Sequence, residues 1–285
     1  MSTVVRELAQ QYPALTVTGP RQSGKTTLCR AVFPEHSYIN LEPLDQRSFA
    51  SEDPRGLLAE HTHGLILDEI QHVPELLGYI QESIDADAAP GRFILTGSQH
   101  FGLSASIGQS LAGRTAVLQL LPLSLEEYND FGIAKNNLYE VMFAGAYPRI
   151  HDRGIPAQRW LADYVATYVE RDVRQIANVT DLGAFTTFLR LCAAHTAQEV
   201  NLTALGNDAG VSHNTARAWL SILETSFLLL RCPAWHRNIR KQLVKRPKLH
   251  FLDSGLVCHL LGIRDSEPLR HHPLRGAIFE SWVAS

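Results

Sequence analysis

The first part of the chain alternates short apolar segments with polar or amphipathic ones, as expected for a parallel sheet covered by helices on both faces. Segments of four or five residues predict the strands, and the stretches between them predict helices and loops. The predicted strands are residues 15–18, 37–41, 64–67, 92–96 and 116–120. The pattern therefore predicts an α/β fold for this part of the chain.

Further along the chain, apolar positions recur at helical spacing and strands become rare. Amphipathic helices are predicted over residues 160–174 and 181–195, and a helix-turn-helix is predicted over residues 202–220. Within the last segment, Gly210 is expected to make the turn and Ser212 to cap the second helix. This part is therefore expected to be mostly helical.

Two further apolar segments, residues 227–230 and 248–252, predict the strands of a wing, so the mostly helical part is expected to contain a winged-helix domain. With 285 residues, the chain is long enough for two modest domains. We expect an α/β domain over residues 1–150, a helical linker over 151–200, the winged helix over 201–262 and the start of another region over 263–285.

The composition is that of a folded globular protein, with 45% hydrophobic and 19% charged residues. The cysteines are isolated, no cluster has the spacing of a metal site, and no apolar run is long enough to span a bilayer. Because the N-terminus lacks a signal-peptide core, we expect a cytoplasmic protein with no membrane partner. Residues 1–160 hold 12 Lys or Arg and 18 Asp or Glu, whereas residues 161–285 hold 14 and 11.

The most specific chemical signal is the segment 19–26, which matches the phosphate-binding pattern G-x-x-x-x-G-K-[ST] without deviation. It lies between a predicted strand and a predicted helix, as a phosphate loop requires. Backbone N–H groups of such a loop converge on the phosphates, and the positive end of the helix adds to the attraction. We therefore expect ATP and Mg²⁺ as cofactors. The expected ATP-binding residues are Gly19, Pro20, Arg21, Gln22, Ser23, Gly24, Lys25, Thr26 and Thr27.

Four residues are expected to perform the chemistry at this loop. Lys25 would supply a point charge to the phosphates, and the Thr26 hydroxyl would ligate Mg²⁺. Asp68 and Glu69 follow the apolar run 64–67. Asp68 would hold the hydration shell of the metal, and Glu69 would orient and deprotonate the attacking water. Because the carboxyl ends of parallel strands meet at one edge of a sheet, we expect these groups to lie together.

Three more residues are candidates for catalysis. Ser98 and Gln99 follow the strand at 92–96 and would face the γ-phosphate or the lytic water, although a polar strand end that only meets solvent is the alternative. Arg114 precedes the last strand. It could stabilise transition-state charge in its own subunit or in a neighbour's, or it could be a surface salt-bridge residue. The sequence leaves that choice open.

With these motifs the chain resembles the AAA-type ATP-binding proteins of bacteria and archaea that pair a P-loop domain with an uncharacterised C-terminal domain. The resemblance covers nearly the whole chain. Its ATPase motifs are specific, whereas the later ones are recognisable only as an ordered set. The motifs are residues 19–28, Leu67-Asp68-Glu69-Ile70-Gln71, Leu95-Thr96-Gly97-Ser98-Gln99, Leu111-Ala112-Gly113-Arg114, Gly145-Ala146-Tyr147-Pro148 and Phe251-Leu252-Asp253-Ser254-Gly255-Leu256.

The resemblance implies an additional-strand P-loop NTPase core with strand order 5-1-4-3-2, a winged-helix segment and a region similar to a restriction-nuclease fold. Residues 263–285 would be the truncated start of that region, with Glu280 in the place of its first acidic residue. The later Asp and Glu-x-Lys that bind metal in that fold are absent from this sequence. Nuclease activity is therefore not assigned to these residues.

The segment 236–248 contains six Lys or Arg and no acid. A basic wing beside a helix-turn-helix suits contact with the phosphate backbone of DNA. A protein-facing or internal role is the alternative, because runs of Lys and Arg are often solvated faces. The candidate nucleic-acid contacts are Arg217, Arg237, Arg240, Lys241, Lys245, Arg246 and Lys248.

The function predicted from these features is a Mg²⁺-dependent ATPase whose nucleotide state controls the position of the winged-helix module. The alternative is a nucleotide-gated regulator that binds DNA or a protein, with little or no turnover. A small-molecule kinase is less favoured, because the Asp68-Glu69 pair favours water as the acceptor. The sequence leaves the partner open, and also a homo-oligomer in which Arg114, Arg171 or Arg174 completes a neighbour's site.

Overall fold

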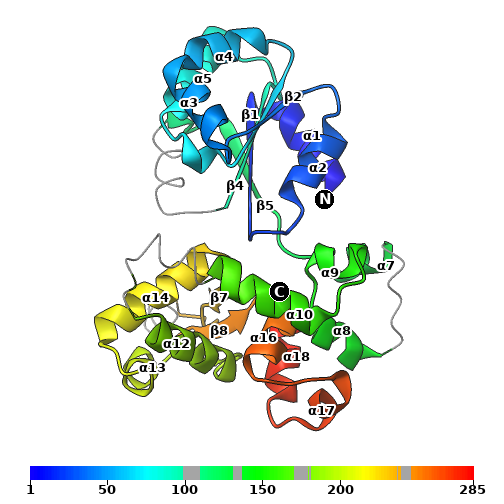
Figure 1. The fold of residues 1–285 in the computed structure, drawn as a ribbon, viewed down its shortest axis with the longest axis vertical. Helices are drawn as coiled ribbons and strands as arrows, with labels where there is room; N and C mark the ends of the chain where they lie inside the picture. The colour runs from blue at the N-terminus through cyan, green and yellow to red at the C-terminus, as the bar shows by residue number, and fades with distance from the viewer. Residues whose placement is uncertain (99–109, 131–136, 170–178, 180, 236, 239–244) are drawn as a thin grey trace. The chain divides into compact units, whose positions relative to one another are not determined.

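The computed structural model describes residues 1–98, 110–130, 137–169, 179, 181–235, 237–238 and 245–285. The chain forms two compact units, Met1–Leu120 and Leu121–Ser285 (Figure 1). Every helix in the described ranges is too short or too polar to cross a lipid bilayer.

The first unit is built on a five-stranded sheet in which all neighbouring strands run parallel. In spatial order from one edge to the other, the strands lie as β2-β3-β4-β1-β5, which is the order 5-1-4-3-2 that the resemblance implied. The predicted parallel α/β fold is therefore confirmed. The strands are β1 (Ala14–Thr18), β2 (Ser37–Asn40), β3 (Leu65–Asp68), β4 (Phe93–Gly97) and β5 (Thr115–Gln119).

Helices cover both faces of this sheet, because successive apolar side chains of each strand point to opposite faces (Figure 1). Ile94 lies in the core on one face, together with Val5 of the first helix. Its neighbours Phe93 and Leu95 lie in the core on the other face, together with Ile80. The helices are α1 (Ser2–Gln11), α2 (Lys25–Val32), α3 (Leu44–Glu52), α4 (Pro54–Glu60), the 3₁₀ helix η1 (Ile70–His72) and α5 (Leu76–Ala86).

The second unit is mostly helical and contains a small antiparallel sheet. The sheet consists of β6 (Gln198–Glu199), β8 (Lys248–Phe251) and β7 (Leu229–Cys232), in that spatial order. The helices are α7 (Leu125–Asp130), α8 (Leu138–Ala144), α9 (Pro148–Asp152), α10 (Ala157–Tyr164), the π-helical turn η2 (Val165–Val169), α12 (Leu182–Ala194), α13 (Leu202–Asp208), α14 (His213–Thr225), α16 (Ser254–Leu260), α17 (Ser266–His271) and α18 (Arg275–Ala284).

Helices α13 and α14 lie in the segment for which a helix-turn-helix was predicted. Between them, Gly210 has a φ of 71°, a conformation that glycine adopts without strain. Ser212 caps α14 by accepting a hydrogen bond from the backbone N–H of Thr215. Ala216 is fully buried and Arg217, the next residue, is exposed. The local signals in this segment thus predicted the turn, the cap and the buried face.

A buried carboxylate joins two of the motifs, although they lie far apart in the sequence. Asp253 is 2% exposed and accepts a hydrogen bond at 2.7 Å from the backbone N–H of Ala146, 107 residues away. It also caps α16 through the N–H of Leu256 at 2.7 Å. Gly255 permits this approach, since a Cβ there would lie 2.8 Å from the backbone of Gly145. Burial raises the pKa of Asp253 to about 6, against the opposing effect of the N–H donors.

Helices α17 and α18 are packed into the second unit. Leu269 of α17 and Ile278 of α18 are fully buried in its core. Ser281 of α18 forms hydrogen bonds with Thr196 at 2.7 Å and with His250 of β8 at 3.1 Å. These contacts fix α18 to the small sheet. The nuclease-like character expected for residues 263–285 stays a prediction.

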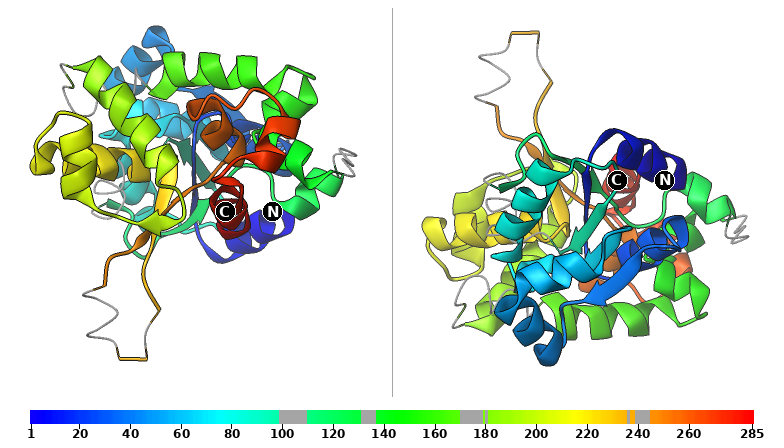
Figure 2. Two further views of the ribbon diagram at one scale, coloured as in Figure 1. Left: turned by 90° about the horizontal axis from the view of Figure 1, so that it is seen from below. Right: turned by 90° about the horizontal axis from the view of Figure 1, so that it is seen from above.

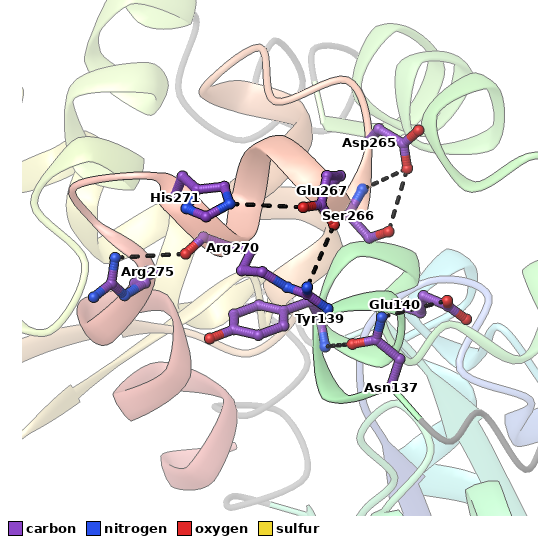
Figure 3. Close-up of polar contacts among 9 residues, drawn as sticks. All are labelled: Asn137, Tyr139, Glu140, Asp265, Ser266, Glu267, Arg270, His271 and Arg275. Atoms are coloured by element: carbon purple, nitrogen blue, oxygen red, sulfur yellow. Dashed lines mark hydrogen bonds and ion pairs between the residues drawn. The ribbon is translucent and has the colours of Figure 1, made fainter.

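Helix α17 also contacts α8 through polar and aromatic side chains (Figure 3). The Arg270 guanidinium lies 5.4 Å from the centre of the Tyr139 ring. The Glu267 carboxylate approaches Arg270 at 3.8 Å and His271 at 3.6 Å. Because these ionic contacts are exposed, they are expected to add little to stability.

The first compact unit ends at Leu120, before the domain boundary predicted at residue 150. Part of the intervening segment belongs to the second core, where Tyr147 is buried and its hydroxyl lies 3.1 Å from that of Tyr164. Long-range contacts of this kind give no local signal in a sequence. The finer division of the second unit into linker, winged helix and a further region stays a prediction.

Replacing Asp253 with alanine should destabilise the second unit, because the N–H groups of Ala146 and Leu256 would lose their acceptor, and a buried N–H left without one costs about 1–3 kcal/mol. Asp181→Ala is the matched control: Asp181 caps α12 at the N–H of Ala184 but is exposed, and loss of such a cap costs about 1 kcal/mol. All four tryptophans lie in the second unit, so urea unfolding followed by tryptophan fluorescence reports on this unit. Equal losses in the two variants would contradict a special role for the buried carboxylate.

Candidate functional site

The phosphate-loop segment connects β1 to α2 through backbone conformations that few residues adopt. Gly24, directly before α2, has a φ of 95°, and Gln22 has a φ of 65°. Gly19 has a φ of 146° and lies against Leu120, whose carbonyl oxygen would be 2.1 Å from a Cβ at this position. Both glycines of the motif are therefore required by backbone conformation, and the first is also required by close packing.

Lys25 is the first residue of α2, and its side chain lies over the loop. Its Nζ donates hydrogen bonds to the carbonyl oxygens of Gly19 at 3.1 Å and Pro20 at 2.8 Å, and the residue is 6% exposed. Burial lowers the pKa of Lys25, while the nearby Glu69 and Asp68 raise it. An ammonium group with these neutral acceptors can exchange them for a phosphate oxygen, which is a stronger partner.

Ser23 provides a test of whether the loop fits a phosphate. Its hydroxyl oxygen is buried and has no hydrogen-bond partner among the residues that the structure describes. Buried hydroxyls are rarely left unpaired, so the loop offers a donor to a group that is not part of the chain. The positive end of α2 and the Lys25 ammonium give the surroundings the sign that an anion needs. The residues present therefore fit the phosphates of a nucleotide.

Asp68, at the carboxyl end of β3, accepts hydrogen bonds from three hydroxyl groups. Thr26 donates to its Oδ2 at 2.7 Å, and Tyr38 of β2 donates to the same oxygen at 2.8 Å. Thr96 of β4 donates to Oδ1. Because Thr26 gives its proton to Asp68, its oxygen lone pairs stay available to a cation. A hydroxyl and a carboxylate are thus held together, and these are oxygen ligands of the kind that Mg²⁺ prefers.

Glu69 follows in the left-handed conformation, with a φ of 59°, which is uncommon for a residue with a side chain. Its carboxylate accepts a hydrogen bond from Nε2 of Gln71. The same nitrogen lies within hydrogen-bond distance of the Ser98 hydroxyl, at 3.2 Å, and Ser98 is buried directly after β4. The structure therefore links Glu69 to Ser98, two of the residues that the sequence proposed for catalysis, through Gln71.

Two other candidates are not brought into this group. Arg114 directly precedes β5, whose first residue pairs with the first residue of β1. It therefore lies at the amino-terminal end of the strands, whereas the phosphate loop lies at their carboxyl end. Its guanidinium binds the Asp85 carboxylate at 2.6 and 3.0 Å. This is the surface salt bridge that the sequence left as an alternative, and the position does not suit a role in its own site. Gln99 lies outside the described residues.

The basic residues of the second unit differ in how their charges are compensated. Lys248 binds Glu280 of α18 at 2.6 Å, so its charge is balanced within the unit. Arg240 and Lys241 lie outside the described residues. Figure 2 shows the described residues between β7 and β8 leading away from the small sheet. Besides Lys248, the exposed candidates are Arg217 of α14 and, between β7 and β8, Arg237, Lys245 and Arg246.

Three residues that hold the two carboxylates carry no specific signal in the sequence. Gln71 and Thr96 lie inside recognisable motifs but were given no role. Tyr38 lies in a predicted strand without a motif. The one cue for Tyr38 is its place near the carboxyl end of β2, the strand beside β3, where Asn40 pairs with Asp68. The strand order that the resemblance implied places β2 beside β3, but it does not indicate which side chain of β2 reaches the carboxylate.

Comparison with known proteins separates the two parts of the chain. Residues 11–129 match the family described as an AAA domain, and residues 135–267 match a domain of unknown function, DUF8612. An uncharacterised protein of Mycobacterium tuberculosis is 29% identical over 283 residues, which cover 98% of this chain and 63% of that protein. An uncharacterised protein of Haemophilus influenzae is 23% identical over 282 residues, which cover 86% of this chain and 68% of that protein. The chain thus spans less than two thirds of the length of the mycobacterial relative.

Among solved structures, the chain is similar to a Walker-type ATPase of Pyrococcus abyssi, with a TM-score of 0.58, 15% identity and coverage of 91% of this chain and 94% of that chain. At this level of identity the likeness concerns the fold alone. The family match, the strand order and the loop with its carboxylates together support an AAA-type P-loop domain in the first unit. These observations support nucleotide binding.

Proposed function

We propose that this chain is a Mg²⁺-dependent ATPase whose nucleotide state controls the position of a winged-helix module in the second unit. The observation that carries the proposal is the grouping of Lys25, Thr26, Asp68 and Glu69 at one edge of the parallel sheet. Together they supply a cation for the phosphates, oxygen ligands for a metal and a base for water.

Each of these groups has a distinct part in the proposed reaction. The backbone N–H groups of residues 19–26 and the Lys25 ammonium would bind the phosphates. Thr26 and Asp68 would hold Mg²⁺, which when bound neutralises charge on the β- and γ-phosphates. Glu69 would orient the attacking water and accept its proton, with Gln71 holding the Glu69 carboxylate in place.

The proposed control of the second unit starts at Leu120, the last residue of the first unit. Its backbone N–H donates to the carbonyl oxygen of Thr18 at 2.8 Å, and its carbonyl oxygen packs against Gly19 of the phosphate loop. Loss of the γ-phosphate contacts would change the loop. Because Leu120 touches the loop directly, such a change would act on the segment that leads to the second unit.

The winged-helix assignment is supported by the order and pairing of the elements. From α12 to β8 the chain runs helix, strand, helix, helix, strand, strand, and β8 pairs antiparallel with both β6 and β7. In this arrangement α13 and α14 correspond to the helix-turn-helix, and the hairpin of β7 and β8 corresponds to the wing.

The alternative function is a regulator that binds nucleotide and acts by occupying DNA or a protein, with little or no turnover. The exposed Arg237, Lys245 and Arg246 favour DNA among these partners, because basic side chains on a hairpin can contact the phosphate backbone. A homo-oligomer in which Arg114 or another arginine of one copy completes the site of the next also stays a prediction.

Lys25→Ala should abolish ATP binding, whereas Glu69→Gln should still bind ATP but hydrolyse it about 100-fold more slowly, because only the second change spares the phosphate contacts and removes the base. Calorimetry measures the binding and phosphate release measures the turnover. Glu75→Gln is the matched control, since Glu75 is exposed and accepts a hydrogen bond from Ser51. Normal hydrolysis by Glu69→Gln would show that the base is misassigned. Binding without hydrolysis by the unmodified protein would favour the regulator.

If nucleotide controls the second unit, a distance between the two units should differ between the ATP and ADP states. Spin labels at Glu52→Cys and Asn207→Cys suit this measurement, because both positions are exposed, in α3 and α13. The background would be Cys232→Ser, since Cys232 is exposed and the other three cysteines are buried. We expect the distance distribution to shift between Glu69→Gln with ATP and the active protein with ADP, and to stay constant in Lys25→Ala. Identical distributions in all cases would refute the control mechanism.

If the hairpin contacts DNA, Lys245→Ala and Arg246→Ala should each weaken duplex binding and lower the slope of log affinity against log salt by about 1. Lys248→Ala is the matched control, because Glu280 already balances the charge of Lys248. Fluorescence anisotropy at several salt concentrations measures these slopes. Equal effects of the three substitutions, or no duplex binding, would argue for a protein-directed module.

A further inference from the structure

The Tyr38 hydroxyl contacts a residue that is expected to hold Mg²⁺, but the phosphate-loop motifs assign no role to Tyr38. Tyr38 lies in β2, an edge strand of the first sheet, two residues before Asn40, which pairs with Asp68. Its side chain reaches Asp68 and donates the phenol O–H to Oδ2 at 2.8 Å. The contact therefore connects the edge strand β2 to the carboxylate that is expected to hold Mg²⁺.

Resting on the function proposed above, we propose that Tyr38 is a positioning residue for the Mg²⁺ site. Its hydroxyl fixes the orientation of the Asp68 carboxylate and, through the shared oxygen, that of the Thr26 hydroxyl. Partners of this kind, which touch a ligand rather than the metal, commonly change metal affinity by about 10–100-fold when they are removed.

The distribution of donors around Asp68 explains why Tyr38 would matter. Oδ2 accepts from Thr26 at 2.7 Å and from Tyr38 at 2.8 Å, whereas Thr96 is on Oδ1. Thr26 is itself expected to become a metal ligand, so its hydroxyl depends on where Oδ2 lies. Tyr38 is the donor that holds Oδ2 without also serving the metal. Without its hydroxyl, the metal would have to order both ligands when it binds, and the free energy used for that would lower its affinity.

The surroundings of Tyr38 help to hold its side chain in place. A phenol is protonated at neutral pH, so its hydroxyl can act as the donor there. The Arg30 guanidinium lies 4.8 Å from the centre of the Tyr38 ring, a cation–π contact that helps to hold the ring in place.

Removing this hydroxyl should leave the fold intact, which makes the proposal testable. Tyr38 lines an open pocket of about 530 Å³ together with Thr26, Arg30 and His36. A phenylalanine ring would occupy the same place, and the substitution would remove a single oxygen atom. Asp68 would keep its hydrogen bonds from Thr26 and Thr96.

The test is the dissociation constant of ADP, measured by calorimetry once with excess EDTA and once with excess Mg²⁺. The constant in EDTA divided by the constant in Mg²⁺ reports how much the metal strengthens ADP binding, without any turnover. For Tyr38→Phe we expect an unchanged constant in EDTA and a ratio reduced by about tenfold. Mn²⁺ titrated into the ADP complex and followed by electron paramagnetic resonance should show the same loss of metal affinity.

Tyr79→Phe is the matched control, because the Tyr79 ring also lies beside an arginine, Arg55 at 5.6 Å, but on α5 and without the contact to Asp68. In an Asp68→Asn background, Tyr38→Phe should add no further effect on the metal. An unchanged ratio in Tyr38→Phe would overturn the proposal, as would weaker binding already in EDTA. Absence of ADP binding by the unmodified protein, or binding that ignores Mg²⁺, would instead refute the nucleotide site on which the proposal rests.

Discussion

The arrangement of the first unit's site depends on the hydrogen bonds that the Asp68 carboxylate accepts. Its three hydroxyl donors come from α2, β2 and β4, while Asp68 itself ends β3. These groups meet because the strands run parallel and in register, with Asn40 beside Asp68 and Val17 beside Thr96. The carboxyl ends of parallel strands share one edge, so one carboxylate can accept hydrogen bonds from three other segments of the chain.

Most of the first unit could be predicted from the sequence, because its strands are short and mostly buried and the phosphate-loop motif marks the edge that carries the site. In a parallel sheet, a residue that ends a strand lies at the carboxyl end of the sheet, as Asp68 does. A residue that precedes a strand, as Arg114 does, lies at the opposite, amino-terminal end. The contact of Tyr38 could not be predicted. The implied strand order places β2 beside β3, but it does not indicate which side chain of β2 reaches the Asp68 carboxylate.

The second unit shows a similar division between local and long-range information. The turn at Gly210 and the cap at Ser212 follow from residue types at adjacent positions, and the structure has both. The boundary of the first compact unit does not follow in this way, because residues before 150 pack into the second core. The contact of Asp253 with Ala146 likewise joins two motifs whose separation along the chain hides their proximity.

The contacts of Lys25 and Asp68 also bear on how the first unit folds. Asp68 finds three hydroxyl donors within the chain, and the Lys25 ammonium finds two carbonyl oxygens. Buried charges that are hydrogen-bonded in this way do not oppose folding as unpaired ones would. The two charges that a phosphate and a metal would meet at this edge therefore do not themselves oppose folding of the first unit.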